Sequence, residues 1–96
     1  MKTKSQPTPR DMKELYEAVL QLESAQECKK FLRDLCTSSE LNAMSERFQV
    51  VKMVRDEVPY REICKKTGSS TATITRVAHW LHHGKGGYKL VLDRIK

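Results

Sequence analysis

The sequence has little of what membrane-spanning or phosphate-binding proteins need. Its 96 residues include only four glycines and three prolines, and aromatic side chains make up 6% of them. Glycine is too sparse for a phosphate-binding loop or a dinucleotide-binding fingerprint. The longest uninterrupted apolar runs are three residues long, at 18–20 and 90–92. A membrane-spanning helix and a signal-peptide core are therefore excluded, and we expect a cytoplasmic protein.

Cysteine is also scarce. The three cysteines, Cys28, Cys36 and Cys64, are odd in number and form no CxxC pair. This pattern indicates neither a disulfide framework nor a thiolate zinc site. We interpret all three as small buried hydrophobic residues in a reducing compartment.

A catalytic arrangement is missing as well. The acidic residues have ordinary roles as helix-start charges or solvent-facing groups, and Ser69 and Ser70 have no histidine beside them. A domain of this size can hardly enclose a catalytic pocket. We therefore expect a protein that is not an enzyme and that uses no cofactor.

What the sequence does have is an uneven distribution of charge. Residues 1–48 carry eight basic and eight acidic side chains, whereas residues 49–96 carry ten basic and four acidic ones. The formal net charge of +6 therefore lies entirely in the second half, which favours a polyanionic partner, either nucleic acid or an acidic protein. A chain of this length buries only about two-thirds of its unfolded surface, which favours sharing a core with a partner chain.

Apolar residues recur at spacings of three and four along most of the chain, which is the pattern of amphipathic helices. A serine or threonine followed three residues later by glutamate predicts helix starts at Ser24 and Thr37. The helix after Thr37 is apolar over so much of its circumference that we expect it to be central. No segment shows the two-residue alternation of a half-buried strand.

These patterns predict an all-α fold of about six helices. Residues 1–10 combine two prolines with polar residues and have no apolar period, so we expect a flexible N-terminal arm. Residues 11–96 are expected to form one domain. Within it, the histidines and glycines of residues 82–87 predict a break before a last short helix.

Residues 59–83 have the layout of a helix-turn-helix motif. Cys64 provides a small side chain where two helices would cross, and Gly68 tolerates the positive φ that the turn requires. Ile74 and Val77 follow Gly68 by six and nine residues and would pack the second helix against the first. These residue types at these offsets predict the motif far more specifically than any one of them alone.

The second helix of this motif has a polar outward face. Short hydrogen-bonding side chains, one methyl group and two longer donors suit close approach to base edges in the major groove of DNA. The expected base-reading residues are Ser70, Thr71, Ala72, Thr75, Arg76 and His79. Other residues, basic or at the start of the helix, are expected beside phosphates. These are Lys65, Lys66, Ser69, Lys85 and Lys89.

Two other interpretations remain open at this point. The helix hairpin could serve packing alone, but a packing hairpin has no need of a polar outer face in the basic half of the chain. The chain could also be a helical dimerisation or adaptor module whose basic half binds an acidic protein partner.

The run TSSELNAMSERFQVVK, followed by YREICKKTGSSTATITR, resembles the Trp repressor superfamily. The ending HHGKGGYKLVL is similar to its YerC/YecD branch of TrpR-related proteins. The resemblance implies two chains intertwined through their N-terminal helices, with the two recognition helices set for successive major grooves of double-stranded DNA. We therefore expect a homodimeric, sequence-specific DNA-binding transcriptional regulator and, by analogy with the family, a repressor.

The resemblance also implies an effector slot between the central helix and the recognition helix. Four residues match positions that surround the amino-acid co-repressor of the Trp repressor. Val77 and Trp80 stand where that repressor has a glycine and a serine, and these larger side chains would crowd the slot. We therefore expect Trp80 to fill part of the slot and free tryptophan not to be the effector. In chain order, the residues of this candidate effector slot are Thr37, Arg47, Thr73, Arg76, Val77 and Trp80.

Three histidines, His79, His82 and His83, lie close together, and the first and last would share a helix face. Two imidazoles lack a third ligand, and no carboxylate sits beside them at helical spacing, so we expect no metal site. Contact with the DNA backbone or exposure to solvent is the interpretation that we prefer.

Overall fold

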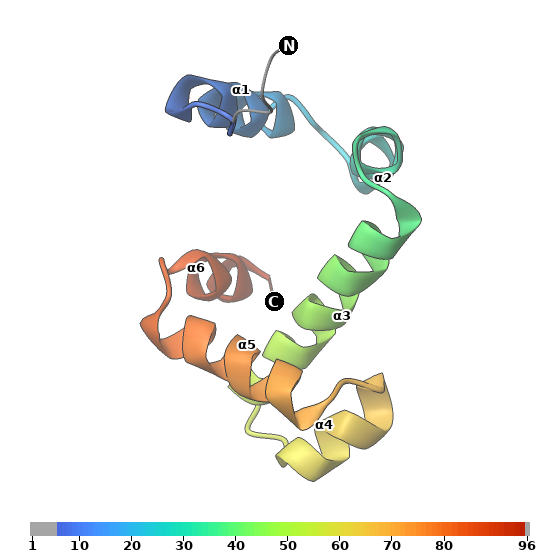
Figure 1. Cartoon of the computed structure of the whole chain (residues 1–96), viewed down its shortest axis with the longest axis vertical. Coiled ribbons are helices and arrows are strands. Elements are labelled where there is room, and N and C mark those ends of the chain that lie inside the picture. Colours follow the sequence, from blue (N-terminus) through green and yellow to red (C-terminus); the bar gives the residue numbers. More distant parts are fainter. Residues whose placement is uncertain (1–5, 96) are drawn as a thin grey trace. The chain divides into compact units, whose positions relative to one another are not determined.

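The computed structural model describes residues 6–95, and in this range it contains six helices and no strand (Figure 1). The all-α class expected from the helical periodicities is therefore confirmed. No helix within 6–95 is long and apolar enough to cross a membrane. The helices are α1 Pro9–Val19, α2 Ala25–Leu35, α3 Ser38–Arg55, α4 Tyr60–Thr67, α5 Thr71–His83 and α6 Gly87–Arg94.

The contacts of the chain divide it into two units, Met1–Thr37 and Ser38–Lys96. The sequence analysis had treated residues 11–96 as one domain. The first unit contains α1 and α2, neither of which has a buried residue. All the buried apolar side chains of the described residues belong to α3–α6. The second unit thus has a core of its own, whereas the first presents two amphipathic helices without one.

Helix α1 begins at Pro9, inside the segment 1–10 that the sequence analysis expected to be a flexible arm. Thr8 caps it: its hydroxyl accepts a hydrogen bond from the Asp11 amide at 3.1 Å, and its own amide donates to the Asp11 carboxylate at 3.0 Å. The hydrogen bond from the Thr8 backbone lowers the pKa of Asp11 below its usual value. Pro9 and Arg10, expected in a flexible arm, are therefore helical, because a proline in the first turn sacrifices no hydrogen bond. Residues 1–5 of that arm lie outside the described residues.

The core of the second unit lies where α3 meets α4 and α5. Its fully buried side chains are Val50 and Val51 from α3, Ile63 from α4 and Ile74 from α5. Leu92 from α6 packs into the same cluster. Helix α3 contacts both α4 and α5, as expected of a central helix. The position of the helix-turn-helix motif is therefore set by packing against α3.

Helix α5 continues through residues 82 and 83, which the sequence analysis had placed in a break. It ends at Gly84, whose amide donates to the Trp80 carbonyl at 2.9 Å. A Cβ at position 84 would lie 2.4 Å from that oxygen, so the close approach requires a glycine there. The break is therefore shorter than expected, and His83 stays on the helix.

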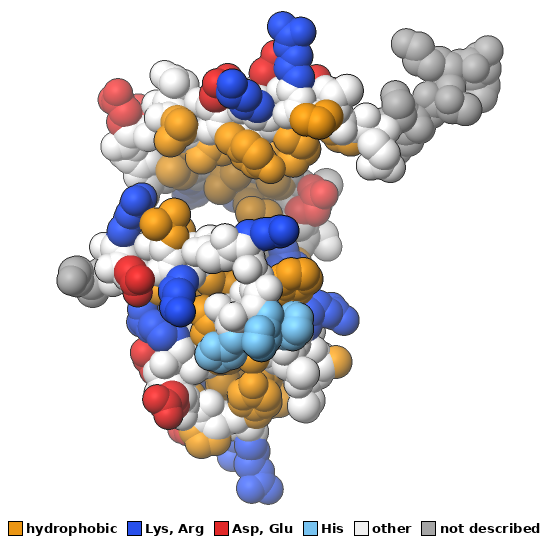
Figure 2. Space-filling model, turned by 90° about the vertical axis from the view of Figure 1, so that its left-hand side faces the viewer, with side chains coloured by type: hydrophobic (Ala, Val, Ile, Leu, Met, Phe, Trp, Pro, Cys, Tyr) orange, Lys and Arg blue, Asp and Glu red, His pale blue; other side chains and the backbone are white. Residues whose placement is uncertain are grey.

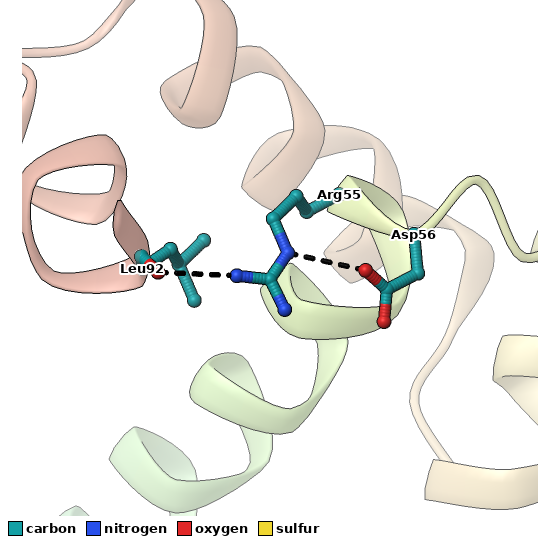
Figure 3. Close-up of polar contacts among 3 residues, drawn as sticks. All are labelled: Arg55, Asp56 and Leu92. Carbon is teal, nitrogen blue, oxygen red and sulfur yellow. Dashed lines mark hydrogen bonds and ion pairs between the residues drawn. The ribbon is translucent and has the colours of Figure 1, made fainter. Parts of the chain in front are cut away.

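Arg55, the last residue of α3, holds the end of α6 (Figure 3). Its Nη1 donates to the Leu92 carbonyl at 3.3 Å, and its Nε pairs with the Asp56 carboxylate at 3.1 Å. The Leu92 carbonyl belongs to the last turn of α6, where carbonyls have no partner within the helix. One side chain therefore fastens the C-terminal helix to the central one.

Replacing Arg55 by alanine is expected to lower the free energy of unfolding by about 1 kcal/mol, because a neutral carbonyl loses its donor. Thermal unfolding measures this loss. Asp56→Ala is the matched control: it removes only the exposed ion pair, which contributes roughly 0–1 kcal/mol in such positions. Equal losses in the two variants would mean that the bond to Leu92 contributes nothing.

Candidate nucleic-acid interface

Helices α4 and α5 form the predicted helix-turn-helix, joined by residues 68–70. Gly68 has φ +77°, the left-handed conformation that glycine adopts without steric cost, and its amide donates to the Cys64 carbonyl at 2.9 Å. The thiol of Cys64 lies 3.9 Å from the Thr71 hydroxyl, so the two helices meet at this small residue. Cys64 is half-buried rather than buried, as are Cys28 and Cys36.

Helix α5 has two sharply different faces. Ile74, Val77 and Ala78 are 0%, 2% and 6% exposed and pack toward the core. The side chain of Ser70 accepts a hydrogen bond from the Thr73 amide and so begins the helix. All the residues expected to read bases are exposed, and they are Ser70, Thr71, Ala72, Thr75, Arg76 and His79.

The four lysines expected beside phosphates are also exposed: Lys65, Lys66, Lys85 and Lys89. The Lys66 ammonium lies 3.7 Å from the Glu62 carboxylate, a solvent-exposed pair one helical turn apart that is easily exchanged for a phosphate. In the described part of the chain the other three lysines have no ion pair. They are therefore available to an anionic partner.

Ser69 differs from the expectation that it contacts phosphate. Its side chain is 4% exposed, and its hydroxyl donates to the Glu46 carboxylate of α3 at 2.5 Å. Its amide donates to the Thr67 hydroxyl at 3.1 Å. Both of its hydrogen-bond donors are thus used inside the protein, and the residue tightens the turn instead of facing outward.

The three histidines form one cluster at the C-terminal end of α5, with basic side chains on either side in Figure 2. The rings of His79 and His83 lie 5.1 Å apart, and those of His82 and His83 lie 6.4 Å apart. No group of three or more histidine, cysteine or acidic side chains able to hold a metal occurs in the described part of the chain. The side chains of all three histidines are exposed.

A cavity of about 380 Å³ lies between α3, α5 and the start of α6. It brings together the expected slot residues Arg47, Thr73, Arg76, Val77 and Trp80. The sixth expected residue, Thr37, belongs to the first unit. Sequence reasoning missed three lining residues, which are Ala43, Glu46 and Tyr88. Ala43 precedes Glu46 by three residues and Arg47 by four, and this helical spacing could have found the first two.

The lining of this cavity combines two arginines and an aromatic wall with Glu46, whose carboxylate accepts a hydrogen bond from Ser69. Neither Arg47 nor Arg76 has an ion-pair partner among residues 6–95. Trp80 is 51% exposed, so it is not a core aromatic residue, and it also lines a neighbouring apolar groove of about 490 Å³ with Phe48 and Tyr88. The two guanidinium groups can therefore pair with an anionic group of a small molecule.

Comparison with known proteins gives one consistent result. The sequence profile of the family described as Trp repressor protein matches residues 10–96. The uncharacterized protein YerC of Bacillus subtilis (strain 168) is 38% identical over 87 residues, which cover 91% of this chain and 84% of that protein.

Two solved structures are similar to this chain, each with a TM-score of 0.86 and 41% sequence identity. One is a TrpR-like protein from Eubacterium eligens ATCC 27750, matched over 90% of this chain and 89% of its own. The other is a candidate Trp repressor from Staphylococcus aureus, matched over 92% of this chain and 88% of its own.

Proposed function

Since this chain belongs to the Trp repressor family, as the resemblance in its sequence indicated, we propose that it is a sequence-specific DNA-binding transcriptional regulator, acting as a repressor in the cytoplasm. The observation that carries the proposal is the division of α5. One face is 0–6% exposed in the core, while six short or hydrogen-bonding side chains face outward. A helix held this firmly on one side and polar on the other suits the major groove.

In the proposed complex, the exposed face of α5 enters the major groove of double-stranded DNA. Arg76 donates to a guanine, the Ala72 methyl group contacts a thymine, and the hydroxyls of the first turn approach bases or phosphates. The exposed lysines of α4 and of the segment around α6 neutralise phosphates and fix the register of the protein on the duplex. Binding alone performs the function, so no catalytic step and no cofactor are needed.

The proposed assembly is a homodimer formed through α1 and α2. Their apolar stripes are uncovered: Met12, Tyr16 and Val19 are 37%, 59% and 45% exposed. Figure 2 shows apolar side chains gathered along one side of the part that these helices form. A second copy of the chain offers the same stripes and can cover both at once. Because residues 1–48 carry no net charge, two such halves do not repel each other.

Selection from a pool of random double-stranded DNA tests the proposed function. A dimer with two recognition helices is expected to enrich a pseudo-palindrome whose half-sites are separated by about 34 Å, one turn of DNA. Absence of enrichment at low salt would favour the alternative, an adaptor module that binds an acidic protein. In that case immobilised acidic peptides would retain the protein in a pull-down experiment, whereas immobilised DNA would not.

We also propose that the 380 Å³ cavity is an effector slot. Its two arginines and its aromatic wall support a small anionic ligand as effector, and Arg76 both lines the slot and faces outward for base reading. A ligand that pairs with Arg76 would change the position of the side chain that reads DNA. The slot is thus placed where occupancy can alter operator affinity.

Free tryptophan is expected not to bind this slot in the micromolar range. Val77 and Trp80 line it, and both are larger than the residues that the Trp repressor has at these positions. Isothermal titration of the protein with tryptophan checks this, and Trp80→Ser is the matched variant because it restores the smaller side chain. Saturable one-to-one micromolar binding to the unaltered protein would contradict the expectation.

A further inference from the structure

Glu46 is a residue of α3 that faces the turn between α4 and α5. It is half-buried, and its carboxylate accepts a hydrogen bond from the hydroxyl of Ser69, a residue 23 positions later in the chain. Ser69 itself is 4% exposed, so water cannot easily replace this hydrogen bond. The contact joins the central helix directly to the residue that precedes the N-cap of α5.

Three further hydrogen bonds surround this contact. The Thr67 hydroxyl donates to the Ile63 carbonyl of α4 at 2.7 Å and accepts from the Ser69 amide at 3.1 Å. The next residue, Ser70, accepts from the Thr73 amide of α5 at 3.1 Å. The turn is thus fastened to α4, to α3 and to α5 through Thr67, Ser69 and Ser70. Among these three attachments, only the one to α3 depends on a side chain outside the motif.

We propose that Glu46 is a positioning residue for sequence recognition: through Ser69 it fixes the direction in which α5 leaves the turn, although it lies behind the DNA-reading face. The proposal rests on the proposed function. Base contacts by short side chains such as Thr71 and Ala72 require a closely defined helix position, whereas long lysine side chains reach phosphates from many positions. Loss of the hydrogen bond between Glu46 and Ser69 is therefore expected to lower the affinity for a specific sequence more than the affinity for random DNA.

The acceptor of the Ser69 hydroxyl is a carboxylate oxygen of Glu46, and the negative charge of the carboxylate strengthens this hydrogen bond. A hydrogen bond to a carboxylate is roughly twice as strong as one between neutral groups. Glutamine at position 46 keeps an acceptor oxygen on a side chain of the same length, whereas alanine has none. Glu46→Gln and Glu46→Ala remove the same negative charge, so any difference between them reports the acceptor and not the electrostatic attraction of DNA.

The experiment compares affinity for a selected operator with affinity for random DNA, measured at one salt concentration for the unaltered protein, Glu46→Ala, Glu46→Gln and Ser69→Ala. For Glu46→Ala and Ser69→Ala we expect the ratio of the two affinities to fall about tenfold, equivalent to 1.4 kcal/mol. For Glu46→Gln we expect a fall of about threefold or less, because a neutral acceptor remains. Random-DNA affinity is expected to stay equal in the two Glu46 variants.

Equal ratios for Glu46→Ala and Glu46→Gln would overturn the inference while leaving the proposed function intact. Failure of the unaltered protein to select any operator would overturn the proposed function and this inference with it. If Glu46→Ala does not fold, Ser69→Ala decides, since it removes one hydroxyl and changes no charge. A Ser69→Ala protein with an unchanged ratio would then contradict the inference.

Discussion

Replacing Arg76 by alanine is expected to weaken operator binding by about 1–3 kcal/mol and to relax the sequence preference at one position of each half-site. Arg76 is exposed on α5 one turn after Ala72, and it has no ion-pair partner among the described residues. Its guanidinium can therefore donate two hydrogen bonds to a guanine without breaking an existing contact. Fluorescence anisotropy with the selected operator and with single-base variants of it measures both effects.

Lys65→Ala is the matched control, because it also removes one exposed positive charge from the helix-turn-helix. This change is expected to weaken binding to all sequences alike and to reduce the slope of affinity against salt concentration by about one counterion. Operator preference stays as it is. Equal losses on operator and random DNA for Arg76→Ala would assign that arginine to phosphate contact instead.

Replacing Ile74 by alanine is expected to lower the free energy of unfolding by about 2–5 kcal/mol. Ile74 is 0% exposed and lies in the core cluster that α5 shares with α3 and α4. Removing three carbons there leaves a cavity in the core cluster. A loss of this size lowers the midpoint of thermal unfolding by roughly 10 °C or more for a chain of this length.

The neighbouring position offers the control for this prediction. Thr75→Ala changes an exposed residue of the same helix and is expected to alter the free energy of unfolding by roughly 0.5 kcal/mol or less. Both variants are compared by thermal and urea unfolding. An Ile74→Ala protein as stable as Thr75→Ala would mean that α5 is not anchored by this side chain.

The helix-turn-helix could be predicted because its determinants are local. Gly68 has the positive φ that its place in the motif requires, and Ile74 and Val77 are buried at the predicted offsets. The polar face of α5 followed from the same helical period, so all six expected base-reading residues are exposed. A period of 3.6 residues and one turn geometry suffice for these inferences.

What could not be predicted depends on contacts between distant residues. Ser69 was expected to face phosphate, but its side chain is bonded to Glu46, whose position is set by the packing of α3. Tyr88 lines the slot because α6 folds back beside α5. The local sequence pattern does not indicate where a short final helix packs. One helix start was within reach: Thr8 followed by Pro9 and Asp11 is a helix-start pattern that the composition of the first ten residues obscured.

The absence of buried residues in α1 and α2 has a consequence, under the proposed function, for how DNA binding depends on the concentration of the chain. If two chains must meet before those helices are covered, the amount of dimer at low expression rises with the square of the chain concentration. Every single chain contains one helix-turn-helix, in a unit with its own core. Two helix-turn-helix motifs are presented together only when two chains pair. Under the proposed function, occupancy of an unsaturated operator then rises more steeply than the chain concentration, so halving the number of chains lowers that occupancy by more than half.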